Sequence, residues 1–154
     1  MTLYVPTPEK GRLEDIRKRF NPIQQALIAT HVTLCRDEDN ADWEKVRLRA
    51  ESIGHFELTI RFGPPIREGN LVYLPALDQT EQFDALRVRL LEDESCRKQE
   101  PHITLIHPRN GRCSLEDFDQ ICLMLHESFD VTFRSMTLIE QVNGSAWKDL
   151  QSFP

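Results

Sequence analysis

The sequence predicts an α+β fold in which two similar βα units place antiparallel sheets around a central cleft. Strand and helix patterns alternate along the chain, and one tetrapeptide occurs twice, as His-Val-Thr-Leu over 31–34 and His-Ile-Thr-Leu over 102–105. A second pair of similar segments follows: Phe-Glu-Leu-Thr-Ile-Arg over 56–61 and Phe-Asp-Val-Thr-Phe-Arg over 129–134. The distance from tetrapeptide to segment is nearly the same in both halves. This self-similarity indicates an internal repeat of one supersecondary unit.

Periodicity and breaker residues predict five elements in the first half. In order, they are a strand over 3–5, a helix ending before Asn21-Pro22, a strand over 26–35, a helix capped by Asn40 and a strand over 56–62. Each helix carries apolar side chains three or four positions apart, first Leu13, Ile16 and Phe20, then Trp43, Val46, Ala50 and Ile53. The run over 26–29 is apolar throughout, as is typical of a buried central strand.

The second half repeats this order. The predicted elements are a strand over 71–74, a helix from Thr80, a charged connector over 92–100, a strand after Pro101, a turn over 108–111, a helix after Ser114, and strands within 130–140 and 146–153. Ser114 and Asp117 resemble a capping box at the start of the second helix. The expected buried positions of the two helices are Phe83, Leu86 and Leu90, then Leu115, Phe118, Ile121, Cys122 and Leu125.

The repeated tetrapeptide supplies the candidate catalytic residues. Alternate side chains of a strand share a face, so His31 lies beside Thr33 and His102 beside Thr104. Two imidazoles on facing strands are suited to acid–base catalysis near neutral pH. A single His on a strand is more often structural, but two copies of the tetrapeptide arise by chance in roughly one shuffled chain in a thousand. The duplication therefore favours a functional role.

Composition limits the classes of function. A chain of 154 residues predicts one domain, residues 1–154, of two pseudo-symmetric lobes. The formal charge of −6 argues against binding of long duplex nucleic acid, although not against one phosphate or RNA end. We expect no signal peptide and no membrane segment, since every apolar run is short. The four cysteines lack metal-type spacing and predict reduced thiols in a cytoplasmic protein, which we expect to be a monomer.

Paired His-x-Thr motifs in a small duplicated α+β chain resemble the 2H (two-histidine) phosphoesterases. The similarity is greatest to their bacterial RNA 2′-5′ ligase/cyclic phosphodiesterase branch, whose second motif resembles Pro101-His102-Ile103-Thr104-Leu105. The resemblance implies His31, Thr33, His102 and Thr104 as the catalytic set, without metal or cofactor. The implied reaction opens 2′,3′-cyclic phosphates of nucleotides or RNA ends, or forms 2′-5′ linkages. It also favours His102 as the base and His31 as the acid in hydrolysis.

The candidate substrate-binding residues surround the two motifs. Many members of the family have Arg five residues after the second His, where this chain has His107, while Arg36 holds that place after the first. Arg109, in a locally basic segment, is a substitute phosphate contact, although a solvated surface explains such charges equally well. Tyr73 and Tyr4 are candidates for stacking on a base, with packing at the rim as the alternative.

A metal site and a non-catalytic binding module are the two alternatives to catalysis by two histidines. In a metal site, His31 and His102 would be ligands, but no third ligand stands at a suitable spacing beside either, and Thr ligates zinc poorly. A non-catalytic binding module would use the same cleft to hold a nucleotide, an RNA end or a partner protein. Intact His and Thr in both motifs favour catalysis, because binding alone would work as well with Arg or Lys.

Overall fold

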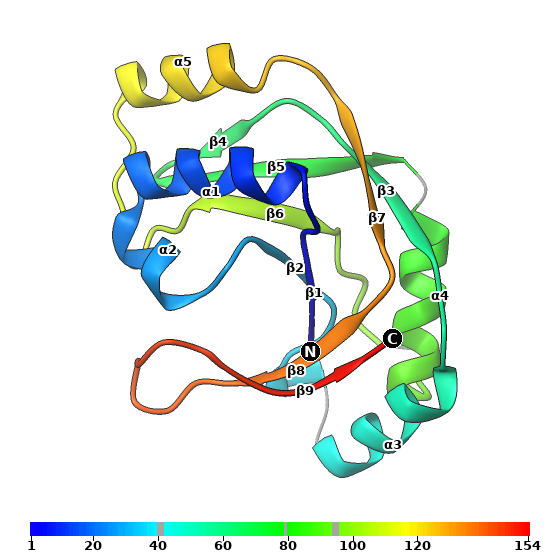
Figure 1. Ribbon diagram of the computed structural model, residues 1–154. Helices are drawn as coiled ribbons and strands as arrows, with labels where there is room; N and C mark the ends of the chain where they lie inside the picture. Colours follow the sequence, from blue (N-terminus) through cyan, green and yellow to red (C-terminus); the bar gives the residue numbers. More distant parts are fainter. Residues whose placement is uncertain (40–41, 79, 94–95) are drawn as a thin grey trace.

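The computed structural model describes residues 1–39, 42–78, 80–93 and 96–154, and Figure 1 shows how its elements are arranged. The elements are β1 (Thr2–Tyr4), α1 (Glu9–Phe20), α2 (Pro22–Leu27), β2 (His31–Thr33), the 3-10 helix η1 (Asp37–Asp39), α3 (Trp43–Ile53), β3 (Leu58–Phe62), β4 (Ile66–Glu68), β5 (Leu71–Asp78), α4 (Thr80–Leu91), β6 (His102–Ile106), α5 (Leu115–Met124), β7 (Phe129–Phe133), β8 (Met136–Glu140) and β9 (Lys148–Phe153).

The strands form one curled antiparallel sheet (Figure 1). Its order is β7-β3-β5-β6-β2-β1-β8-β9, and β4 pairs with β5 beside this path. The predicted α+β class with antiparallel strands is therefore confirmed. The two motif strands, β2 and β6, lie next to each other in the sheet and are hydrogen-bonded edge to edge, where the sequence predicted that they would face each other across a space.

The predicted duplication is visible in the order of elements. The series β1-α1-β2-α3-β3 is followed by β5-α4-β6-α5-β7, with the same alternation of strand and helix. Val32 of β2 pairs with Ile103 of β6, and Thr59 of β3 pairs with Thr132 of β7. These partners are also equivalent positions of the sequence repeat. A pairing of equivalent residues in antiparallel strands is the local signature of twofold symmetry.

The second pair of repeated segments forms a self-complementary contact between β3 and β7. The Thr59 and Thr132 hydroxyls are 2.8 Å apart in a hydrogen bond, and one Arg–carboxylate pair stands on either side of them. Arg61 lies 3.9 Å from Asp130, and Arg134 lies 2.8 Å from Glu57. The Phe-acid-aliphatic-Thr-apolar-Arg pattern recurs because each copy supplies the acid for the other's arginine. The two arginines are solvent-facing, as ion pairs on an exposed sheet surface usually are.

The aliphatic residues of the motifs lie in the hydrophobic core. Val32, Leu34, Ile103 and Leu105 are fully buried, which fixes the opposite faces of β2 and β6 toward His and Thr. The predicted inward residues of α1 and α4 are also buried, including Leu13, Ile16, Phe83, Leu86 and Leu90. Four polar side chains therefore stand on one face of two neighbouring strands that the core holds in register.

The strand predicted over 26–35 is wrong in its first half. Residues 22–27 form α2, with Pro22 in the first helical turn, and the strand itself spans only 31–33. Proline is favoured at this position because its missing N–H would be unpaired there in any helix. A short apolar run such as 26–29 does not distinguish a strand from a helix by periodicity, and Ala26 is in fact exposed.

Other differences concern boundaries and one helix face. The edge strand β4 was not predicted, and Leu115 is 72% exposed instead of buried. The predicted cap Asn40 lies outside the described residues; the N-cap of α3 is Asp42, whose side chain accepts from the Lys45 N–H at 3.2 Å. The strand expected over 130–140 is divided into β7 and β8, while the capping box at α5 is confirmed.

The paired threonines of β3 and β7 make a testable contribution to stability. We expect Thr59→Val and Thr132→Val each to lower the free energy of unfolding by about 1–2 kcal/mol, since each leaves one half-buried hydroxyl without its partner. The double variant should cost less than the sum of the two, because neither hydroxyl remains to be satisfied. Urea unfolding of the four proteins measures this coupling, and strictly additive losses would contradict the contact.

Candidate active site

The register of β2 and β6 brings the four predicted catalytic side chains together. With Val32 opposite Ile103, His31 lies across from Thr104, and Thr33 across from His102. All four side chains are half-buried, in contrast to the buried aliphatic residues that alternate with them. Each imidazole therefore has a hydroxyl two residues along its own strand and another on the neighbouring strand.

Both imidazoles are oriented by the same kind of hydrogen bond. The Nδ1 of His31 is 2.8 Å from the carbonyl oxygen of Ala29, and the Nδ1 of His102 is 3.0 Å from that of Glu100. A carbonyl oxygen only accepts, so Nδ1 carries the proton in each contact. The lone pair of each neutral ring then resides on Nε2. Two equivalent Nε2 atoms are thus available for proton transfer on one face of the sheet.

A tyrosine ring stands edge-on to each histidine. Tyr4 and His31 have ring centroids 6.4 Å apart, and Tyr73 and His102 have centroids 5.5 Å apart. The Tyr4 hydroxyl donates to Asp149 at 2.7 Å, and the Tyr73 hydroxyl donates to Glu68 at 2.7 Å. Burial, with the Asp149 contact, raises the pKa of Tyr4, and the hydrogen bond to Glu68 raises that of Tyr73. Both phenols stay protonated and act as fixed walls beside the imidazoles.

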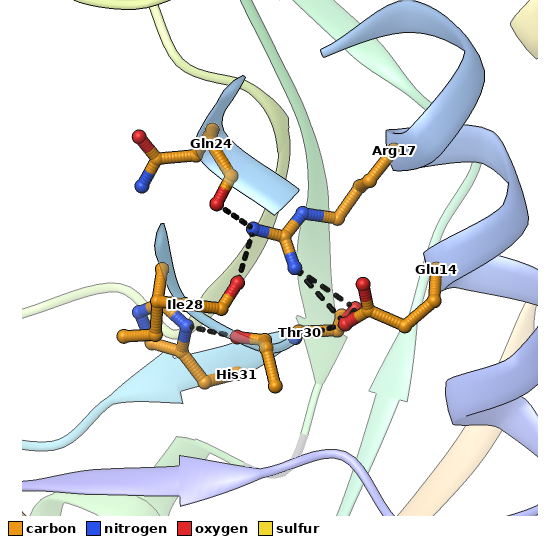
Figure 2. Close-up of polar contacts among 7 residues, drawn as sticks. Glu14, Arg17, Gln24, Ile28, Thr30 and His31 are labelled. Atoms are coloured by element: carbon orange, nitrogen blue, oxygen red, sulfur yellow. Dashed lines mark hydrogen bonds and ion pairs between the residues drawn. The ribbon is translucent and has the colours of Figure 1, made fainter. Parts of the chain in front are cut away.

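A buried arginine lies next to the segment that leads into β2 (Figure 2). Arg17, on α1, is 1% exposed, and hydrogen-bond acceptors surround its guanidinium. They are the Glu14 carboxylate at 3.0 Å, the Thr30 hydroxyl at 3.2 Å, and the carbonyls of Gln24 and Ile28 at 3.3 Å and 2.8 Å. A charge this deep in the protein is tolerated only where such partners replace its hydration.

These contacts determine where the acceptor of His31 lies. Glu14 accepts hydrogen bonds from both the backbone N–H and the hydroxyl of Thr30, while Arg17 holds the carbonyl of Ile28. Ile28 and Thr30 are the two neighbours of Ala29, whose carbonyl receives the His31 Nδ1–H. The Arg17–Glu14 pair therefore holds both sides of the peptide that orients His31.

The second half contains a matching arginine. Arg87, on α4, is also 1% exposed; it donates to the carbonyls of Leu34 at 2.8 Å and Arg97 at 2.7 Å, and lies 3.4 Å from Asp39. Neither arginine was predicted as a functional residue, although the helical spacing indicates its buried position. Helical spacing puts Arg17 and Arg87 on the inward face of their helices, and an ionic residue on a predicted core face indicates a buried polar network.

The surroundings of His31 lower its pKa to about 4. Desolvation is the main cause, since removal of water penalises the charged ring. The hydrogen bond to the Ala29 carbonyl opposes this effect, and electrostatic repulsion from the Arg17 guanidinium adds to it. His31 is therefore a neutral imidazole at pH 7, with Nδ1 protonated and Nε2 able to accept a proton.

This architecture matches solved structures. The E. coli LigT structure with 3′-AMP aligns at a TM-score of 0.54 and 16% identity, over 99% of this chain and 94% of LigT. The chain has the fold of LigT. The apo form of LigT aligns at a TM-score of 0.53 with 17% identity, and the phosphate complex at 0.51 with 16%; each alignment covers 99% of this chain and 93% of LigT. No family model and no curated protein matches the sequence.

On this LigT fold, three of the predicted substrate contacts lie where the motif strands end. Arg36 is exposed after β2, and His107 follows β6, with its Nδ1 accepting from the Arg109 N–H at 3.2 Å. Burial lowers the pKa of His107, with further lowering from the charges of Arg109 and Arg36. The three groups thus lie within electrostatic reach of one another, while the fourth predicted contact, Tyr73, lies against His102.

Three further observations concern the described residues as a whole. Within them, His, Cys, Asp and Glu side chains nowhere gather in groups of three or more that could hold a metal ion. None of the helices that the structure describes combines the length and apolar character needed to cross a membrane. The four cysteines have free thiols, with Cys35 and Cys113 buried.

The lowered pKa of His31 predicts a specific loss of stability in acid. The unfolded chain has a His31 pKa near 6.5, so it takes up a proton before the folded protein does, and unfolding is favoured as the pH falls from about 6.5 toward 4. Between pH 7 and pH 4.5, the wild-type protein should lose about 2 kcal/mol more than His31→Asn in urea unfolding. The exposed His126→Asn is the control and should follow the wild type. Equal losses in wild type and His31→Asn would refute the shift.

Removal of the buried arginine should be severe. Arg17→Met leaves the Glu14 carboxylate and two carbonyls without their donor and should lower the free energy of unfolding by about 3–5 kcal/mol. The exposed Lys18→Met on the same helix should change it by less than about 0.5 kcal/mol. The double variant Glu14→Gln/Arg17→Met should recover part of the loss, because no unpaired charge remains. Denaturant unfolding measures each, and a near-neutral Arg17→Met would contradict the positioning role.

Proposed function

We propose that this protein is a metal-independent phosphoesterase that hydrolyses 2′,3′-cyclic phosphates of nucleotides or RNA ends by acid–base catalysis with two histidines. The observation that carries the proposal is the pair of imidazoles on neighbouring strands, each with Nδ1 bound to the carbonyl two residues before it and Nε2 available. A structural His needs no such duplication. Two proton-transfer groups and two hydroxyls suffice for this reaction.

The reaction requires a base and an acid on opposite sides of phosphorus. A water molecule attacks the phosphorus in line with the bond to the departing ribose oxygen, and the water proton passes to one Nε2. The other imidazole protonates the ribose oxygen as the bond breaks, which leaves a phosphate monoester and one free ribose hydroxyl. Thr33 and Thr104 donate hydrogen bonds to the phosphoryl oxygens, on which negative charge increases in the transition state.

The environment of His31 keeps its ring in the neutral form, which can accept a proton. A pKa of about 4 keeps this ring neutral at pH 7, with the Nε2 lone pair available for the water proton. His102 is then the acid in hydrolysis. This assignment is the reverse of the one that the resemblance to 2H phosphoesterases implies. Attack by the 5′-hydroxyl of a second RNA end in place of water would form a 2′-5′ linkage with the same two groups.

The fold and the surrounding charges support the proposed phosphoesterase reaction. LigT, whose fold the chain shares, has been crystallised with 3′-AMP and with phosphate, and both ligands correspond to parts of the proposed product. Arg36 and Arg109 supply positive charge near the ends of the motif strands, and His107 supplies a ring nitrogen, as substrate-binding residues for the phosphate. Tyr73 offers a ring beside His102 for a nucleoside on that side of the phosphate.

The function is tested by substitution of each histidine. His31→Ala and His102→Ala should each lower kcat/KM for 2′,3′-cyclic nucleotides by about 10²–10⁴-fold, since each removes one proton-transfer group. Chromatography of the monophosphate product measures turnover, and circular dichroism checks the fold. His126→Ala, which alters an exposed ring, is the matched control and should retain wild-type turnover.

Three outcomes would overturn the proposal or part of it. Full turnover in either His variant would exclude two-histidine catalysis. Loss of wild-type turnover in excess chelator would exclude metal independence. Binding of 3′-AMP by a wild-type protein that forms no product from any of the four cyclic nucleotides, or from an oligonucleotide with a cyclic-phosphate end, would identify a binding module instead.

A further inference from the structure

A pocket adjoins the His31 side of the candidate active site. Its volume is about 540 Å3, and it lies between the end of β1, the start of α1, the end of α2 and the start of β9. Side chains of aromatic, basic and aliphatic character line it, chiefly Tyr4, Lys10, Leu27, Trp147, Lys148 and Asp149. None of these residues belongs to the two His-x-Thr motifs.

The pocket shares Tyr4 and Ala29 with the surroundings of His31. Tyr4 forms part of its wall and is also the ring that stands edge-on to His31. Ala29, another lining residue, provides the carbonyl that accepts from His31 Nδ1. A phosphate held at the imidazoles therefore has the pocket beside it, separated by one tyrosine ring.

The walls of the pocket are held in place. The hairpin between β8 and β9 reaches beneath α2 (Figure 1), and the backbone N–H of Trp147 donates to the backbone carbonyl of Leu27 at 2.8 Å. Asp149 fixes the Tyr4 hydroxyl on the other side. The Trp147 side chain is 36% exposed, so that part of the indole remains open to a ligand. The backbone contact thus fixes the hairpin segment that carries the indole.

The charge of the pocket is opposite to that of the protein. Lys10 and Lys148 line it as exposed cations, and the carboxylate of Asp149 is already engaged by Tyr4. The chain as a whole has a formal charge of −6. An aromatic platform with nearby cations is the combination that binds single-stranded nucleic acid, where bases stack and lysines contact the backbone. The overall negative charge restricts this contact to a short segment.

We propose that this pocket binds a nucleobase of the RNA substrate, stacked on the Trp147 indole, with Lys10 and Lys148 facing the sugar-phosphate backbone. The inference rests on the proposed function and specifies its substrate, because a ligand that also filled this pocket would be a nucleotide or oligonucleotide and not a bare phosphate ester. The base belongs to the nucleoside that carries the reacting phosphate or to the one before it in the chain.

Fluorescence tests the contact directly. The chain has two tryptophans, so Trp43→Phe leaves Trp147 as the only emitter. In this variant we expect 3′-AMP to quench the emission and inorganic phosphate to leave it unchanged. If the base is that of the preceding nucleoside, only a dinucleotide with a 3′-phosphate will quench. No quenching by 3′-AMP or by the dinucleotide at saturating concentrations would overturn the inference.

Kinetics provides the second measurement. Trp147→Ala should lower kcat/KM for a cyclic-phosphate dinucleotide by roughly tenfold or more, the usual effect of losing one stacked base. Leu150→Ala, at an exposed apolar residue on β9 three positions after Trp147, is its control and should have no effect. Lys10→Gln should lower kcat/KM for the same dinucleotide, whereas Lys18→Gln on the same helix should not. Equal kcat/KM in wild type and Trp147→Ala would contradict the pocket.

Failure of the pocket and failure of the function are distinguishable. If the wild type turns over cyclic nucleotides but nucleotides do not quench Trp147, the pocket is refuted and the phosphoesterase stands. If no substrate is turned over, the function is refuted, and quenching by nucleotides alone decides whether the pocket binds a base. Folding of every variant is checked by its urea midpoint.

Discussion

The antiparallel pairing of β2 with β6 is the constraint on which the site depends. Because Val32 lies opposite Ile103, a single register places each histidine across from the threonine of the other motif. A shift of β2 by one residue would turn the side chains of His31 and Thr33 into the core and bring Val32 and Leu34 to the surface. The buried aliphatic residues of the motif therefore keep its histidine and threonine side chains on the opposite face of the sheet.

The site also depends on charges that the fold buries at some cost. Arg17 and Arg87 each lie almost wholly inside the protein, and their guanidinium groups bind backbone carbonyls next to the motif strands. Replacement of a whole buried ion pair, both the arginine and its acid, by apolar packing is often no less stable. What the arginines add is direction, because several donors in one plane fix several carbonyls at once. One of the segments held in this way carries the carbonyl that orients His31.

Much of the fold and the centre of the site could be predicted from the sequence, because both are encoded by local patterns that occur twice. Strand alternation and the repeated tetrapeptide sufficed for the class of fold and for the grouping of His31 and His102. The edge-to-edge pairing of their strands could not be predicted, since strand order is decided by long-range contacts. The helix α2 was missed because four apolar residues have no distinctive period. The inward position of Arg17 was visible in the helical spacing, but two of its four hydrogen-bond partners are backbone carbonyls, which leave no trace in the sequence.

The near-twofold symmetry of the motif strands has a consequence for strand polarity. A phosphodiester at a symmetric centre could enter in either of two directions, with its 5′ side toward His31 or toward His102. Elements without a symmetric counterpart must decide between them. The short helix α2 lies on the side of His31 only, and the β8–β9 hairpin closes over it there. For the RNA substrate that we propose, the direction of the strand is thus set by the parts of the protein that the duplication does not share.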